Sequence, residues 1–151
     1  MQLSWFGIQE LGTVAGAHDV VDLFSDVRMP YAGLVTSDAV VQKRPDLLMK
    51  MIRGSLKGVA YEKTYHDDAV KIIADYGKLS PEQTVFDFDR VLLSAIPDNI
   101  GSTEMQTNEI ALRAELLDLP KDRIPPYGAV YDFAALRQAN QDLKDWKPPS
   151  P

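Results

Sequence analysis

Apolar residues recur at helical spacing through most of the chain. The clearest stripe lies on one predicted helix face and comprises Leu47, Leu48, Met51, Ile52, Leu56, Val59 and Ala60. Pro45 precedes the stripe and suits the first turn of a helix, because an amide hydrogen would have no intrahelical partner there. The pattern therefore predicts a long helix that begins at Pro45 and whose buried face is centred on Leu56.

Cap residues and apolar spacing predict further helices on both sides of this one. These helices cover residues 37–43, 67 or 68 to 77, 80–96, 102 or 103 to 119, and 132 to about 143. Ser80, Pro81 and Gln83 form a strong start signal, because a serine cap, a proline and a glutamine at these positions each favour initiation. Gly77 is the predicted C-cap of the helix before them, and residues 121–128 are predicted to form a loop.

Two short segments before the helices have the composition of strands. Residues 20–24 are apolar apart from Asp22, and residues 31–36 are rich in residues that favour strands. We therefore expect an α+β protein that is mostly helical, with two short strands followed by five or six helices.

The length and the pattern predict one domain. The chain has 151 residues, which suits a single domain, and we place it at residues 20–145. Residues 1–19 show no clear period, so their structure is left open. Residues 146–151 end in prolines and are predicted to be a flexible tail.

The composition is that of a globular protein and excludes several functional classes. Hydrophobic residues make up 45% and charged residues 25%, which disfavours intrinsic disorder. The net charge of −6 disfavours nucleic-acid binding, which needs a basic face. No apolar run is long enough to span a bilayer, and the first residues lack the pattern of a signal peptide. The absence of cysteine excludes disulfides, thiolate metal sites and a cysteine nucleophile.

The order of four short sequence motifs along the chain is more informative than any one of them. The segments that matter are Tyr31-Ala-Gly-Leu-Val-Thr-Ser37, Lys43-Arg-Pro-Asp-Leu47, Asp67-Asp-Ala-Val-Lys-Ile-Ile73, and Tyr131-Asp-Phe-Ala-Ala-Leu136 with Ala139. In this order, over residues 16–145, the chain resembles the C-terminal region of substrate-binding proteins of the nitrate/sulfonate/taurine ABC-transporter type. These proteins share a superfamily with thiamine-pyrimidine precursor proteins.

The resemblance implies part of a type II periplasmic-binding-protein architecture. It also implies a function, which is to bind a small polar or anionic solute and present it to an ABC permease outside the cytoplasm. The lack of a signal peptide leaves a cytoplasmic location open. Family members have two α/β lobes with the ligand between them, so we expect this chain to be truncated and to form a homodimer that covers exposed apolar surface.

The resemblance also suggests ligand contacts near the expected strand crossing. Tyr31 is the first candidate, and His18, Asp19 and Ser37 follow. Tyr31 can equally be a core aromatic residue at the start of a strand. We expect no catalytic residue, no cofactor and no metal site.

Two groups with acidic residues are alternative candidate sites. His66, Asp67 and Asp68 can at most bind a hard cation weakly, because acids at a helix start are already favoured by the helix dipole. Asp87 and Asp89 lie two residues apart and point to different sides of a helix, which favours solvated surface over acid–base chemistry.

Two other functional classes remain open. The chain can be a helical interaction module or relic domain with no small-molecule ligand. It can also be a fragment of a thiamine-pyrimidine precursor-type enzyme, although such enzymes use a cysteine-rich motif that is absent here.

Overall fold

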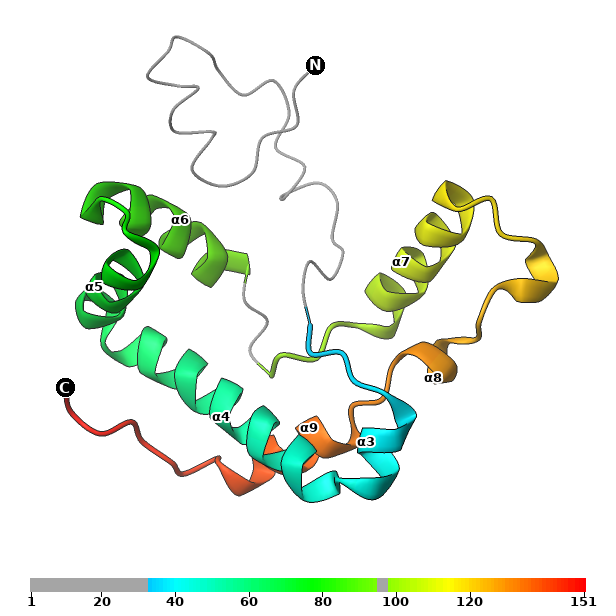
Figure 1. Cartoon of the computed structure of the whole chain (residues 1–151), viewed down its shortest axis with the longest axis horizontal. Coiled ribbons are helices and arrows are strands. Elements are labelled where there is room, and N and C mark those ends of the chain that lie inside the picture. The colour runs from blue at the N-terminus through cyan, green and yellow to red at the C-terminus, as the bar shows by residue number, and fades with distance from the viewer. Residues whose placement is uncertain (1–32, 95–97) are drawn as a thin grey trace, which may run out of the picture. The chain divides into compact units, whose positions relative to one another are not determined.

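The computed structural model describes residues 33–94 and 98–151, and most of these residues are helical (Figure 1). The helices are α3 (Asp38–Lys43), α4 (Pro45–Thr64), α5 (His66–Gly77), α6 (Pro81–Ser94), α7 (Thr103–Leu116), the 3-10 helix η1 (Lys121–Arg123), α8 (Tyr127–Val130) and α9 (Ala134–Asp142). Within these ranges no helix is sufficiently long and apolar to cross a membrane.

The expected α+β class is wrong for the described part of the chain, which contains no strand. Residues 33–36 were expected to end the second strand, yet they have no regular structure and are exposed. Val35, for example, is 96% exposed. A strand needs a partner for its backbone groups, and composition alone does not supply one. The expected strand at residues 20–24 lies outside the described residues, so the partial type II architecture has no support here.

The chain divides into two compact units. In the described residues, the first unit contains residues 59–94 and 148–151, and the second contains residues 33–58 and 98–147. Helix α4 contributes residues to both units, so each unit is described by itself below.

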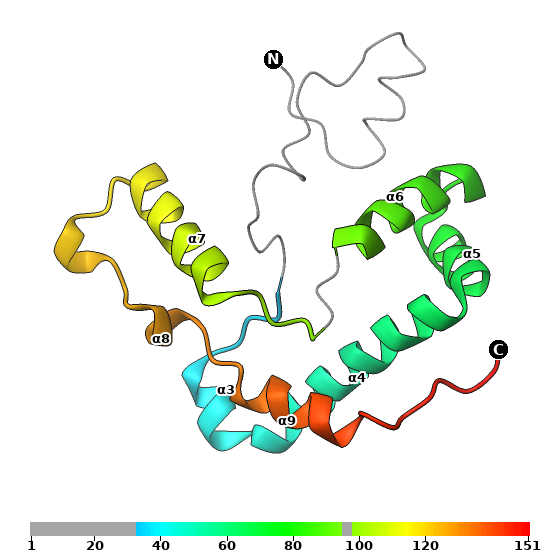
Figure 2. The ribbon, with the colours of Figure 1, turned by 180° about the vertical axis from the view of Figure 1, so that it is seen from behind.

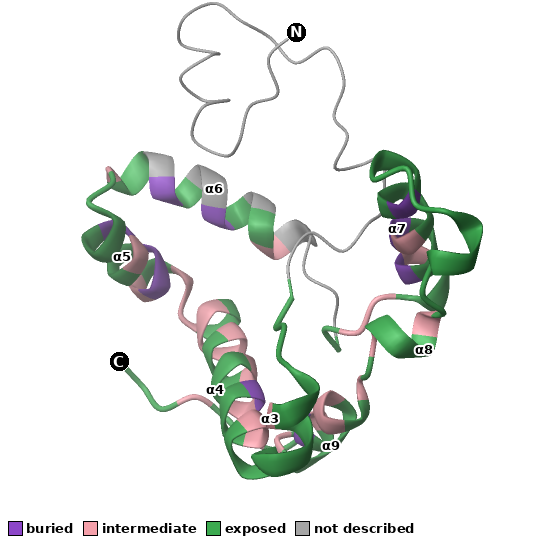
Figure 3. Ribbon diagram, turned by 45° about the vertical axis from the view of Figure 1, so that its right-hand side comes forward, coloured by how far each residue is buried: buried purple, intermediate pink, exposed green. Residues whose placement is uncertain are grey.

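The first unit is built on the pairing of α5 with α6 (Figure 3). Ala69 and Val70 of α5 and Phe88 of α6 are buried together, and Ile73 and Leu92 pack against them. Pro81 is the first residue of α6, as predicted. The main-chain oxygen of Ser80 accepts bonds from the amide and the hydroxyl of Thr84, which fixes this helix start.

The turn between α5 and α6 differs from the prediction in one residue. Gly77 is the last residue of α5, and Lys78 rather than Gly77 is its C-cap. Lys78 has the left-handed conformation, with φ at 54°, and its amide donates to the Ala74 carbonyl. A glycine near a helix end marks the region of the cap, but its neighbour can adopt the left-handed conformation at a modest cost in free energy.

Helix α4 begins at Pro45 as predicted, but its buried face is centred elsewhere. Ile52 is buried with 8% exposure, whereas Leu56 is only half-buried and Met51 is 55% exposed. A stripe of apolar residues shows which face of a helix turns inward, but not which position along the face has a neighbour. The prediction that Leu56 is the centre of this face is therefore wrong.

Helix α7 starts where the sequence predicted. The Ser102 hydroxyl accepts a hydrogen bond from the Met105 amide at 3.1 Å, so Ser102 is a true N-cap. The helix ends at Leu116, earlier than the expected residue 119, and Asp118 is in the left-handed conformation. After it, η1 and the short α8 occupy the segment that was predicted to be a loop (Figure 2).

Within the second unit, an ion pair and a cation–π contact link α9 and the residues after it to α4. The N-cap of α9 is Phe133 rather than the predicted Asp132, although the Asp132 carboxylate accepts a bond from the Ala134 amide at 2.8 Å. Asp142 forms an ion pair with Arg53 of α4, and the Arg53 guanidinium lowers the pKa of the Asp142 carboxyl. The Lys57 ammonium lies 5.2 Å from the centre of the Trp146 ring, which is a cation–π contact just beyond α9.

Candidate functional site

The predicted ligand contacts are not brought together in the described residues. Tyr31, His18 and Asp19 lie outside those residues. Ser37 directly precedes α3 and is exposed, and its hydroxyl makes no capping hydrogen bond. Its main-chain oxygen instead accepts bonds from the amides of Val40 and Val41. The Ser37 side chain is therefore accessible, but the structure does not show the cleft in which it was expected to lie.

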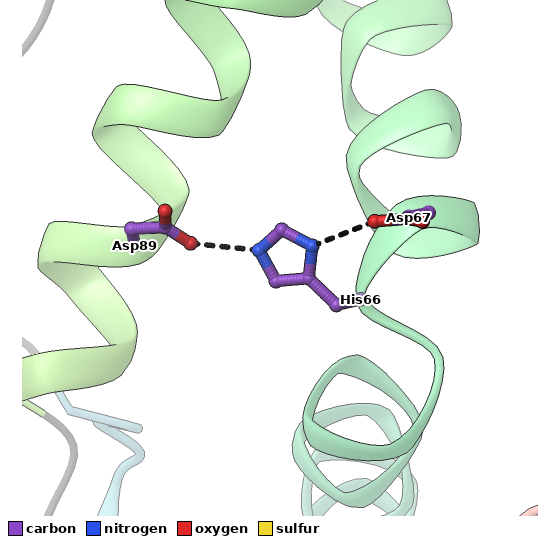
Figure 4. Close-up of polar contacts among 3 residues, drawn as sticks. All are labelled: His66, Asp67 and Asp89. Atoms are coloured by element: carbon purple, nitrogen blue, oxygen red, sulfur yellow. Dashed lines mark hydrogen bonds and ion pairs between the residues drawn. The ribbon is translucent and has the colours of Figure 1, made fainter.

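A polar cluster of titratable side chains lies at the pairing of α5 with α6 in the first unit (Figure 4). His66 is the first residue of α5 and lies between two carboxylates. Its Nε2 is 2.7 Å from Asp89 Oδ1 on α6, and its Nδ1 is 3.1 Å from Asp67 Oδ1 on α5. Its ring also meets Phe88 edge to face, with 5.2 Å between the ring centres. One imidazole therefore contacts both helices.

The two carboxylates favour the charged form of His66. The hydrogen bond to Asp89 raises the pKa of the His66 imidazole, the bond to Asp67 adds to this, and partial desolvation opposes it. A neutral imidazole carries one N–H, so it can donate to only one carboxylate. The imidazolium carries two N–H groups and satisfies both Asp67 and Asp89. The geometry therefore matches a protonated histidine.

Asp68, the third acidic candidate at this helix start, has a different partner. The Tyr61 hydroxyl of α4 donates to Asp68 Oδ2 at 2.5 Å, and this bond raises the pKa of the Tyr61 phenol. Tyr61 also packs against Tyr65, with 5.1 Å between ring centres. Asp68 and His66 therefore do not converge on a shared cation. In the part of the chain that the structure describes, no group of three or more suitable side chains can hold a metal ion.

A second polar cluster joins α7 to α8 in the second unit. Gln106 of α7 is almost fully buried, and its side-chain oxygen accepts a bond from the Tyr127 hydroxyl at 2.7 Å. Glu109, one turn later, is also buried and accepts bonds from Arg113 at 2.7 Å and from the Tyr131 hydroxyl. Both oxygens of the Glu109 carboxylate are thus engaged.

The environment of Tyr131 keeps its hydroxyl protonated. Desolvation raises its pKa to about 12, and the hydrogen bond to Glu109 acts in the same direction. The Tyr131 ring lies between those of Tyr127 and Phe133, at 5.7 and 5.9 Å between ring centres. Because these donors and acceptors bond one another, the cluster links α7 to α8 and to the residue that follows α8.

Sequence reasoning found only part of these clusters. It singled out His66, Asp67 and Asp89, but it did not pair His66 with Asp89, which is 23 residues away. The side chain of Asp87 is not among those that the structure describes. The buried Glu109 was missed, although its spacing of four residues from Arg113 is a recognisable ion-pair signal on a helix.

In comparisons with known proteins, no family model, no curated protein and no solved structure matches the chain.

Proposed function

We propose that the chain is a solute-binding component of an ABC import system for a small polar or anionic solute. The observation that carries the proposal is the order of the helices that bear the motifs. Helix α3 follows Thr36 and Ser37 directly, and the long helix α4 opens at Pro45. The resemblance to nitrate/sulfonate/taurine-type binding proteins predicts these two helix starts, and it also predicts a strand before Ser37, where residues 33–36 have no regular structure.

The later helices support the same proposal. The segment from Asp67 to Ile73 lies within α5, whose last residue is Gly77, and the family pattern has a glycine-containing turn after this segment. The Tyr131-Asp132 pair directly precedes the start of α9. Ala139 of α9 is fully buried, which explains why a small residue suits that motif position.

The proposal extends to location and partners. A solute-binding component of this type works outside the cytoplasm and delivers its solute to a membrane permease, so we propose both for this chain. It carries out no reaction, and its ligand contacts are proposed to be Tyr31, His18, Asp19 and Ser37.

Titration of the whole chain with taurine, nitrate and an aminopyrimidine tests the proposal. Nuclear magnetic resonance detects weak binding, and we expect saturable shifts with one of the three at about millimolar strength, or about 4 kcal/mol of binding free energy. Tyr31→Ala and Ser37→Ala should weaken that binding. Two matched controls, at exposed Tyr76 and Ser55, should leave it unchanged. No saturable shift with any of the three probes contradicts the proposal.

Exposed apolar side chains favour a second candidate, a helical interaction module. Leu116 and Leu117 at the end of α7 are adjacent and are 74% and 68% exposed. Contiguous exposed apolar surface is typical of contact sites with other proteins, and these two side chains are the basis for proposing one here. We propose that the simplest form of such an interaction module is a homodimer, and light scattering tests this.

The genes beside the gene for this chain separate the two candidate functions. Genes for a permease and an ATPase favour transport, whereas an isolated gene favours the interaction module.

A further inference from the structure

We propose that His66 is a pH-sensitive clasp that holds α5 to α6 when it is protonated and loosens the pair when it is neutral. The proposal is independent of the proposed function, because it concerns the first unit alone and needs no ligand. The ring of His66 bridges Asp67 and Asp89, and Figure 4 shows both carboxylates facing its two nitrogens.

Among the described side chains, the charged groups that contact His66 come from the two helices that meet at this point. Asp67 belongs to α5 and Asp89 to α6, whereas Asp68 is engaged by the Tyr61 hydroxyl of α4. The third described neighbour of the ring, Phe88, is apolar and meets it edge to face. The groups placed against the imidazole therefore favour its positive charge, and removing that charge removes one of the two bonds.

The contact that the clasp supports lies directly beside His66. Among the described side chains, the apolar core between the helices includes Ala69, Val70 and Phe88, with Ile73 and Leu92 packed against it. His66 lies against Phe88 at this core, and its side chain is 38% exposed, so solvent reaches it. A change of protonation at His66 therefore acts directly on the contact between α5 and α6.

The direction of the pH dependence follows from the raised pKa of His66. A group whose pKa is higher in the folded state binds protons more tightly there than in the unfolded state. Its contribution to stability is complete below the unfolded pKa of about 6.5, and it is lost as the pH rises through the folded pKa. We expect α5 and α6 to open more often in mildly alkaline than in mildly acidic solution.

Two measurements on the whole chain test the clasp. The first is the nuclear magnetic resonance titration of the His66 imidazole, with His18→Gln leaving His66 as the single histidine. We expect a pKa above the ordinary value, a decrease in Asp89→Asn, and a smaller decrease in Asp67→Asn. Asp75→Asn, on an exposed position of the same helix, is the matched control and should have little effect.

The second measurement is hydrogen exchange of the α5 and α6 amides on both sides of the titration. Protection factors, which remove the intrinsic pH dependence of exchange, should fall about two- to fivefold as His66 loses its proton, as expected for a partly exposed ion pair. The fall should be absent in His66→Gln. A His66 pKa at or below the ordinary value, or the same pH dependence in His66→Gln as in the wild type, overturns the proposal.

Discussion

Phe88→Ala is the substitution that tests the packing of the first unit most sharply. Phe88 is 6% exposed and shares its core with Ala69 and Val70. Truncation of a buried phenylalanine to alanine costs about 3–5 kcal/mol, through lost burial and the cavity that remains. The edge-to-face contact with His66 adds about 0.5–1.5 kcal/mol that the alanine cannot make.

We expect a loss of about 3–5 kcal/mol, because Phe88 is buried together with Ala69 and Val70. Chemical denaturation followed by circular dichroism measures it. Val85→Ala on the same helix is the control, because Val85 is 37% exposed and should cost less than about 1 kcal/mol. Equal small effects of the two substitutions would refute the packing of α6 on α5 through Phe88.

Three further predictions concern single positions. Ile52→Ala should cost about 2–5 kcal/mol and Leu56→Ala clearly less, because only Ile52 is buried; denaturation curves with the opposite order contradict this. Lys78→Gly should stabilise the chain by about 0.5–1 kcal/mol, because glycine adopts the left-handed conformation of residue 78 without strain, and an unchanged or lower melting temperature counts against it. The Tyr131 phenol should titrate near its pKa of about 12 and at a lower pH in Glu109→Gln, as the absorbance difference from Tyr131→Phe reports. Titration of wild-type Tyr131 near 10 shows that its hydroxyl is exposed to solvent.

Helix starts were the most predictable part of the fold. Pro45, Pro81 and Ser102 each act through groups within their own helix turn, so the sequence contains the whole cause of each start. Helix ends were less predictable. The position of the left-handed residue, Lys78 or Gly77, depends on small energy differences between neighbouring residues.

Features that depend on distant residues were not predictable in the same way. Residues 33–36 have the composition of a strand, but no neighbouring strand accompanies them in the described part of the chain. The stripe on α4 indicated the correct face but the wrong centre, because burial of Ile52 depends on where other helices lie. His66 and Asp89 meet only because α5 pairs with α6, a contact that no local pattern encodes.

The proposed role in solute import is tested most directly by uptake in cells. Cells from which the gene for this chain is deleted are compared with cells that carry it, using labelled taurine, nitrate and an aminopyrimidine at low concentration. We predict that deletion lowers the uptake of one of these solutes, that the wild-type gene restores it, and that Tyr31→Ala restores it less well than the matched Tyr76→Ala control. Unchanged uptake of all three solutes after deletion would contradict the proposed function.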